Sequence, residues 1–121
     1  MNNYDDLKIE GGKNIAIKAP PHVFIPTVEF YIDILKLEVI EENPNSIKFR
    51  FGEMNLYIDK VEHISQAEVW LEICVNSVEL ASKYFEEKKI VRCDSIEKLP
   101  NDFKGFWILN PASIVHLVTV D

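Results

Sequence analysis

The sequence predicts an α+β fold made of two tandem βαβββ modules, over about residues 13–61 and 68–121. In each half, a segment with period-2 hydrophobic alternation precedes a segment with helical periodicity, and three short segments rich in β-branched and aromatic residues follow. The aromatic pairs Phe30-Tyr31 and Tyr84-Phe85 also occupy equivalent places in the two predicted helices. This repetition of one element order along the chain predicts a duplicated unit.

The first module is predicted to begin with a strand over residues 14–19, where two isoleucines alternate with polar or small residues. Two prolines follow this strand. After Pro26, Thr27 is a candidate N-cap, and apolar residues spaced three or four positions apart predict a helix over residues 28–35. Turn-forming residues separate the three further strands, which are predicted at residues 37–42, 46–51 and 55–61.

The second module repeats this order. Apolar and polar residues alternate over residues 69–75, which predicts a strand. Asn76 and Ser77 then offer a cap, and residues 78–88 carry apolar side chains at helical spacing with Glu and Lys on the other side. The remaining strands are predicted at residues 90–94, 105–109 and 114–120.

The N-terminal residues 1–12 are polar and end in Gly11-Gly12, so we expect a flexible segment or an added edge segment there. A length of 121 residues and a 47% apolar composition are those of one ordinary globular domain, which we place at residues 13–121. The sequence therefore needs no disulfide scaffold, and Cys74 and Cys93 are expected to be free thiols.

The charge balance excludes some classes of partner. The chain has 13 basic and 20 acidic residues and a net charge of −7, with no concentrated basic patch, so we expect neither nucleic-acid binding nor membrane-surface binding. The apolar run at residues 114–120 is too short to span a bilayer, and the polar start lacks the hydrophobic region of a signal peptide. We therefore expect a cytoplasmic protein.

Two stretches resemble a known superfamily. Residues 30–39, FYIDILKLEV, are similar to the "FYrdvLGlev" stretch of the glyoxalase/bleomycin-resistance/dioxygenase superfamily, also called vicinal oxygen chelate proteins. Residues 110–117, NPASIVHL, are similar to its "DPDGNxIEL" turn and last strand, with Asn110, Ala112 and Ser113 in place of the usual Asp, Asp and Gly. Together with the βαβββ order, the resemblance covers residues 13–121.

The resemblance implies that the two modules form a curved mixed sheet around a central cavity, with the helices outside. Successive side chains of a strand point to opposite faces of the sheet. We expect the helices to be faced by Ile15, Ile17, Val69, Leu71 and Ile73, so the residues between them in sequence would face the cavity. In the last strand we expect Val115 and Leu117 on the helix side. The side chains expected to line the cavity and bind a ligand are Asn14, Lys18, Tyr57, Asp59, Trp70, Glu72, Cys74 and His116.

Metal-dependent members of the superfamily hold one divalent ion with His or Glu side chains from four strands. Carried over to this chain, those positions are Asn14, Tyr57, Trp70 and His116, of which only His116 is a common metal ligand. Trp70 has no lone pair to offer a metal. We therefore expect no metal and no cofactor.

The polar residues of the expected cavity allow two interpretations. Glu72 and His116 could form a catalytic acid–base pair, in which the carboxylate orients the imidazole and raises its basicity. Equally, Glu72 and Lys18 could pair and simply close the cavity, with His116 satisfied by a backbone carbonyl. Cys74 could act as a nucleophile beside His116, although a buried cysteine usually behaves as a small hydrophobe.

Two functions follow from these interpretations. The first is a metal-independent small-molecule-binding protein that sequesters an aromatic or cationic ligand, because an aromatic ring and nearby carboxylates attract positive charge. The alternative is a lyase or isomerase with His116 as general base and Lys18 or Tyr57 stabilising an oxyanion. An interaction module with a vestigial cavity is a third possibility. We expect a homodimer, from the resemblance and from the general frequency of two-fold assemblies.

Overall fold

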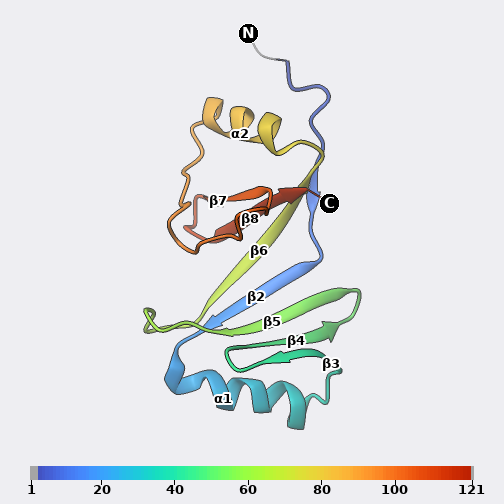
Figure 1. Cartoon of the computed structure of the whole chain (residues 1–121), viewed down its shortest axis with the longest axis vertical. Coiled ribbons are helices and arrows are strands. Elements are labelled where there is room, and N and C mark those ends of the chain that lie inside the picture. Colours follow the sequence, from blue (N-terminus) through green and yellow to red (C-terminus); the bar gives the residue numbers. More distant parts are fainter. Residues whose placement is uncertain (1–2, 121) are drawn as a thin grey trace. The chain divides into compact units, whose positions relative to one another are not determined.

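The computed structural model describes residues 3–120, which form a mixed α+β fold with eight strands and two α-helices. These residues divide into two compact units (Figure 1). The first unit is Lys13–Trp70, and the second combines residues 3–12 with residues 71–120. The predicted α+β class is thus found in the structure, with the βαβββ order complete in the first unit.

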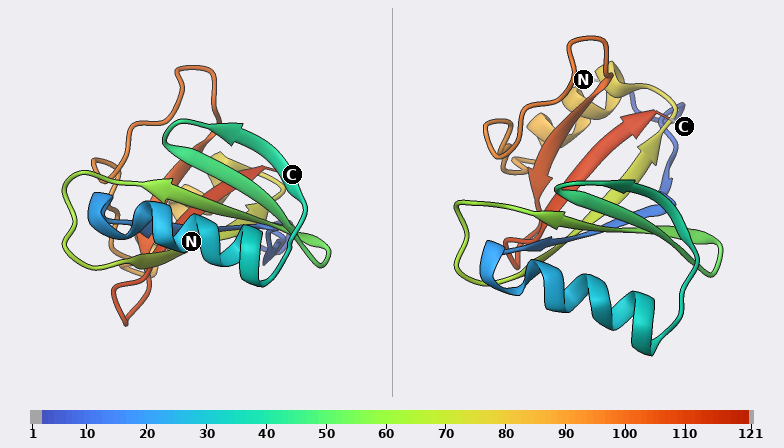
Figure 2. Two further views of the ribbon diagram at one scale, coloured as in Figure 1. Left: turned by 90° about the horizontal axis from the view of Figure 1, so that it is seen from below. Right: turned by 60° about the horizontal axis from the view of Figure 1, so that its bottom comes forward.

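The first unit contains β2 (Asn14–Ala19), α1 (Pro21–Glu29), a π-helical segment η1 (Phe30–Ile34), β3 (Val39–Asn43), β4 (Ser46–Phe51) and β5 (Met54–Lys60). Its strand order is β3-β4-β5-β2, and β2 also pairs with the first residues of β6 (Glu68–Val75). Strands β2 and β5 are parallel, and the other pairs are antiparallel. Helix α1 lies along one face of this sheet (Figure 2).

The core of the first unit lies between α1 and the sheet. Phe24 and Val28 of α1 pack with buried residues of β4 and β5, among which Phe49 and Ile58 are completely buried. Ile15 and Ile17 of β2 are partly buried against the same cluster. These two isoleucines therefore face the helix, as the alternation of the sequence predicts.

Helix α1 begins seven residues before the predicted start at residue 28, so the predicted N-cap at Thr27 is wrong. Pro21 occupies the first turn, where its missing N–H costs no hydrogen bond. The Thr27 hydroxyl instead donates to the carbonyl of Val23 at 2.7 Å inside the helix. Pro26 also lies within the helix, and after it the backbone widens into η1, where the Leu35 N–H bonds to the carbonyl of Phe30, five residues back.

The second unit contains β1 (Ile9–Gly11), the later residues of β6, α2 (Val78–Glu87), β7 (Gly105–Leu109) and β8 (Val115–Val120). Strand β6 pairs with β1 in antiparallel and with β8 in parallel orientation, and β7 pairs with β8 in antiparallel orientation. The Ser77 hydroxyl accepts a hydrogen bond from the Leu80 N–H, so Ser77 is the N-cap of α2, in agreement with the predicted cap. The core consists of Val75, Ala81, Phe85, Phe106, Ile108 and Val118.

The strand predicted at residues 90–94 is wrong: only an isolated bridge forms there, between Arg92 and Ile108. The side chain of Asp94 explains the interruption. Its Oδ1 accepts the N–H of Trp107 at 3.1 Å, where a continuing strand would offer a backbone carbonyl, and its carboxylate also pairs with Arg92. The segment therefore leaves β7 after a short contact.

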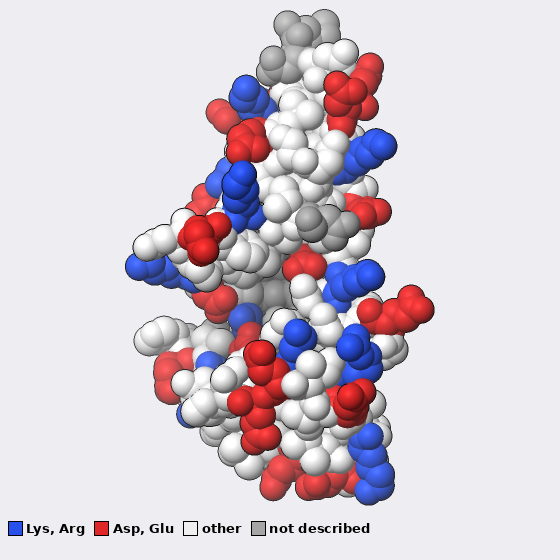
Figure 3. Space-filling view, turned by 45° about the vertical axis from the view of Figure 1, so that its right-hand side comes forward, with Lys and Arg blue, Asp and Glu red and all other residues white. Residues whose placement is uncertain are grey.

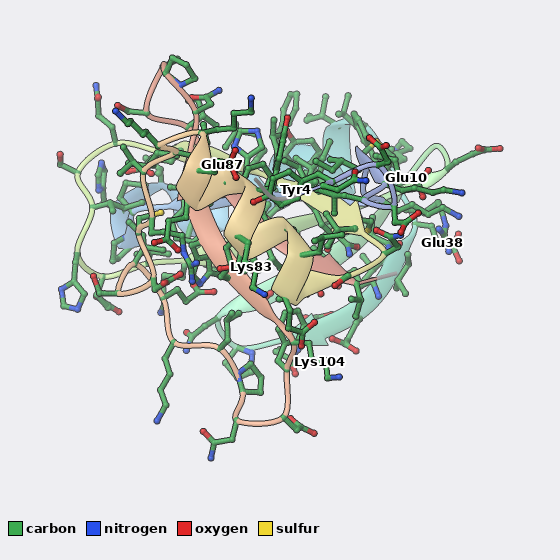
Figure 4. The ribbon with its side chains drawn as sticks, turned by 90° about the horizontal axis from the view of Figure 1, so that it is seen from above. Tyr4, Glu10, Glu38, Lys83, Glu87 and Lys104 are labelled. Atoms are coloured by element: carbon green, nitrogen blue, oxygen red, sulfur yellow. The ribbon has the colours of Figure 1, made fainter. Side chains whose placement is uncertain are left out.

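The N-terminal segment is tied to the second unit. The side chain of Asn76 accepts the N–H of Lys8 at 2.8 Å and donates to the carbonyl of Asp6 at 2.7 Å, so it bonds to the segment as a strand backbone would. Tyr4 lies beside α2 and donates its hydroxyl hydrogen to Glu87 at 2.7 Å (Figure 4). Part of residues 1–12 thus forms an added edge strand. Neither α-helix among residues 3–120 has the length and apolar character needed to cross a bilayer.

Candidate functional site

A polar sheet face in the first unit collects most of the predicted site residues. In β2, Asn14, Ala16 and Lys18 alternate with the isoleucines that face α1, so they lie on the opposite side of the sheet. The register of the neighbouring strands extends this side, because residues paired directly across strands share a face. We define the polar face as Asn14, Ala16, Lys18, Ser46, Lys48, Arg50, Asn55, Tyr57, Asp59, Glu68 and Trp70.

Lys18 extends from β2 on the polar face and is only 5% exposed. Its Nζ forms an ion pair with Asp59 Oδ2 at 2.7 Å and lies 4.4 Å from the centre of the Trp70 ring. The other carboxylate oxygen of Asp59 accepts a hydrogen bond of 2.5 Å from the Ser46 hydroxyl. Burial of a charge is costly unless it is paired, and here a carboxylate and an aromatic face both stabilise the ammonium.

The other side chains of the polar face also contact one another. The indole N–H of Trp70 donates to Glu68 Oε1 at 2.9 Å. Asn55 donates to the side-chain oxygen of Asn14 at 2.9 Å. The arrangement is therefore a network of fixed polar groups beside two aromatic rings, those of Trp70 and Tyr57, which is the composition of a small-molecule site.

Lys48 and Arg50 project from β4 on the same face, since they are two residues apart in a strand. The Nζ of Lys48 lies 5.6 Å from the centre of the Tyr57 ring. The Arg50 guanidinium is exposed and reaches the side-chain oxygen of Asn55 at 3.4 Å. On the viewed side of the molecule, basic and acidic side chains are interspersed (Figure 3).

Five of the residues predicted to line one cavity share the polar face: Asn14, Lys18, Tyr57, Asp59 and Trp70. The β4 side chains and the amide of Asn55 were not among the predicted site residues. The same alternation that orients β2 applies to residues 46–51, where Ile47 and Phe49 are buried and their neighbours are not. That signal could have found Ser46, Lys48 and Arg50.

The parity predicted for the last strand is wrong. In the second unit, β6 and β8 pair so that Leu71 lies opposite His116 and Glu72 lies opposite Leu117. Val118 is completely buried in the core with α2, and His116, two residues before it in the strand, shares its face. Glu72 and His116 therefore lie on opposite faces of the sheet.

Among the predicted site residues of the second unit, Glu72 and Cys74 contact each other, and His116 lies on the other face of the sheet. His116 Nδ1 lies 3.0 Å from the carbonyl oxygen of Ile114. Cys74 is buried on the same face as Glu72, and its thiol donates to Glu72 Oε1 at 3.8 Å. The Glu72 side chain occupies the space where a Cβ of Gly12 would lie, and the Gly12 N–H bonds to the Glu72 carbonyl at 2.8 Å. Asp59 is one partner of the Lys18 ammonium, at 2.7 Å.

Comparisons with known proteins identify the fold. No protein-family model matches the sequence, and no curated protein matches it. The Mn(II)-bound glyoxalase from Novosphingobium aromaticivorans is similar over 95% of this chain, with a TM-score of 0.68 and 14% identity. A variant of homoprotocatechuate 2,3-dioxygenase from Brevibacterium fuscum is similar over 94%, with a TM-score of 0.65 and 18% identity. A glyoxalase/bleomycin resistance protein/dioxygenase superfamily member from Vibrio splendidus 12B01 is similar over 94%, with a TM-score of 0.62 and 13% identity.

These matches differ in how much of each known protein the chain covers. It spans 40% of the glyoxalase and 33% of the dioxygenase, but 100% of the Vibrio splendidus protein. The resemblance predicted from the sequence is thus confirmed at the level of the fold: the chain has the fold of the glyoxalase/bleomycin resistance/dioxygenase superfamily.

The positions that correspond to the metal ligands of that superfamily do not fit a metal site here. The Trp70 indole N–H has no lone pair and donates to Glu68. Asn14 uses its side-chain oxygen to accept from Asn55. His116 lies on the α2 face of its sheet, beside Ile108 in the pairing of β7 and β8. No cluster of three or more His, Cys, Asp or Glu side chains suited to a metal ion occurs within residues 3–120.

Proposed function

We propose that this chain is a metal-independent small-molecule-binding protein and that the polar face of the first unit is its ligand site. The observation that carries the proposal is the buried ammonium of Lys18, which Asp59 and Trp70 fix in place on the side of the sheet away from the hydrophobic core. A sheet face that only contacts solvent carries exposed charges. Half-buried polar groups that are held in place by contacts beside aromatic rings are typical of ligand sites.

Native mass spectrometry of protein purified without chelator tests metal independence. We expect a mass without a stoichiometric divalent ion, because the carried-over positions Asn14, Tyr57 and Trp70 supply no set of three common metal ligands. The same spectrum reports the number of subunits, and we propose a homodimer. One tightly held divalent ion per chain would overturn the metal-independent function.

Mapping by NMR tests the location of the site. A chemically broad set of small molecules is first screened by thermal shift, and each hit is then followed by the backbone amide signals of the chain. We expect hits to shift the amide signals of β2, β4 and β5. We expect Tyr57→Ala to lower the affinity of these hits, because Tyr57 presents a half-buried ring to the polar face. The matched control is Phe30→Ala, which removes an exposed aromatic ring from η1. Hits that map elsewhere, or that are insensitive to Tyr57→Ala, would contradict the proposal.

The alternative lyase or isomerase function has less support. Its general base, His116, was predicted to be oriented by Glu72, and the strand register places these side chains on opposite faces. His116→Ala is therefore expected to leave binding at the polar face unchanged. An activity toward a carbonyl substrate that disappears in His116→Ala would instead favour the alternative.

A further inference from the structure

We infer that the polar face selects an organic anion, specifically an aromatic carboxylate, rather than the cationic ligand that the acidic composition suggests. This inference rests on the proposed function, because it assigns the charge of the ligand bound at that same face. It follows from which charged groups of the face are already engaged and which are open to a ligand.

The carboxylates of the polar face already have partners. Both oxygens of Asp59 are engaged, one by the Lys18 ammonium at 2.7 Å and the other by the Ser46 hydroxyl at 2.5 Å. Glu68 accepts the indole N–H of Trp70 at 2.9 Å. A cationic ligand would have to displace these contacts to reach Asp59, and each displacement leaves a polar group of the protein unsatisfied.

The aromatic ring that could hold a cation is also engaged. The Lys18 ammonium already lies 4.4 Å from the centre of the Trp70 ring, and only 6% of Trp70 is exposed. A second cation on this ring would meet the repulsion of Lys18 at close range. The Trp70 ring therefore contacts the ammonium of Lys18 and is not open to the cation of a ligand.

Two positive charges of the face are open to a ligand. Lys48 and Arg50 lie side by side on β4, and neither forms an ion pair with another of residues 3–120. Arg50 reaches Asn55 only at 3.4 Å, the long limit of a hydrogen bond. Glu41, which lies opposite Lys48 across β3 and β4, is exposed and accepts from the Asn43 amide at 3.4 Å.

These groups suit a planar anion. A guanidinium presents two parallel N–H donors that match a carboxylate, and the ammonium of Lys48 adds a second positive charge from the same strand. Tyr57 lies next to Lys48 in the pairing of β4 and β5 and is half-buried, so an aromatic ring attached to the carboxylate would pack against it. Arg50, Lys48 and Tyr57 therefore form the binding surface for an aromatic carboxylate.

The experiment compares three probes that share one ring and differ in charge: benzoate, benzamide and benzylamine. Each is titrated into the full chain at millimolar concentration while backbone amide and Arg side-chain NMR signals are followed. We expect benzoate to shift signals of β4 and β5 at lower concentration than benzamide, and benzylamine to bind weakest. Arg50→Gln should weaken benzoate binding at least about tenfold, since it removes a charge-assisted hydrogen-bonding pair, and should leave the affinity for benzamide nearly unchanged.

The matched control is Lys36→Gln, which removes one positive charge from an exposed residue of the same unit outside the polar face. It should not change the affinity for benzoate. Benzylamine binding at the polar face as tightly as benzoate, or benzoate binding unaffected by Arg50→Gln, would overturn the anion preference while leaving the proposed function intact. If none of the probes shifts signals of the polar face, the inference fails together with the proposed use of this face.

Discussion

The ion pair between Lys18 and Asp59 should contribute to stability mainly because Lys18 is buried. The change to make is Asp59→Asn, which keeps the size of the side chain and a partner for the Ser46 hydroxyl but removes the negative charge that pairs with Lys18. Removal of one partner of a buried ion pair costs about 3–5 kcal/mol, because the other charge is left uncompensated. Two features of the structure reduce this cost.

Water can reach part of the pair, because the side chain of Asp59 is 18% exposed and that of Lys18 is 6% exposed. The Trp70 ring also continues to stabilise the ammonium, by about 1 kcal/mol. We therefore expect Asp59→Asn to lower the free energy of unfolding by about 2–3 kcal/mol. Urea unfolding at pH 7, followed by tryptophan fluorescence, measures this difference.

A double-mutant cycle separates the buried charge from other effects. Lys18→Met removes the ammonium and keeps an unbranched apolar chain against Trp70, so we expect a smaller loss of about 1 kcal/mol. The combination of Lys18→Met with Asp59→Asn removes both charges of this ion pair and should be nearly as stable as Lys18→Met alone. The exposed Asp33→Asn is the control and should change stability by less than about 0.5 kcal/mol. If the two single losses simply add, the pair is not coupled and the reasoning is refuted.

Three further predictions concern backbone and thiol positions. Gly52 has a φ of 66° and open space around it, so Gly52→Ala should cost about 1–2 kcal/mol through backbone strain alone. Gly11→Ala, which meets neither strain nor atoms within 4 Å, should be nearly neutral in the same unfolding assay. Gly105→Ala should lower the free energy of unfolding more than Gly52→Ala, because the added Cβ would lie 2.8 Å from the carbonyl oxygen of Val118. Equal losses would contradict this close approach of β7 and β8. Burial raises the pKa of the Cys93 thiol, and the charge of Asp94 raises it further, although Arg92 opposes this. Asp94→Asn should therefore move the pH profile of Cys93 alkylation, measured by peptide mass spectrometry, to lower pH, and an unchanged profile would contradict the assigned cause.

The sequence predicted the first unit well because its alternation is unambiguous. In β2 and β5, every second residue is an apolar residue that packs under α1, so both the strands and the side of the sheet that carries Lys18, Tyr57 and Asp59 followed directly. The helix start was missed because Pro26 looked like an N-terminal signal, whereas Pro21 takes that place and the helix tolerates Pro26 by widening into η1.

The second unit was harder to predict for a physical reason. In β8, Leu117 and Val118 are adjacent apolar residues, so the period-2 pattern fits either face and the alternation alone does not determine which one packs under α2. Only the pairing of β8 with β6 and β7 fixes that Val118 is the core residue. The same ambiguity is what made His116 look like a partner of Glu72.

The charge preference of a site is decided by local pairing rather than by net charge. The net charge of −7 favours cations at long range, but at physiological ionic strength such attraction is screened beyond about 8 Å. A bound ligand contacts side chains at about 3–4 Å, where the pairing of each group matters most. At the polar face Asp59 is bound to a hydroxyl and an ammonium, while Arg50 on β4 has no carboxylate partner among the described residues. An acidic protein can therefore present a cationic site, and the Arg50→Gln comparison of benzoate with benzylamine measures this difference directly.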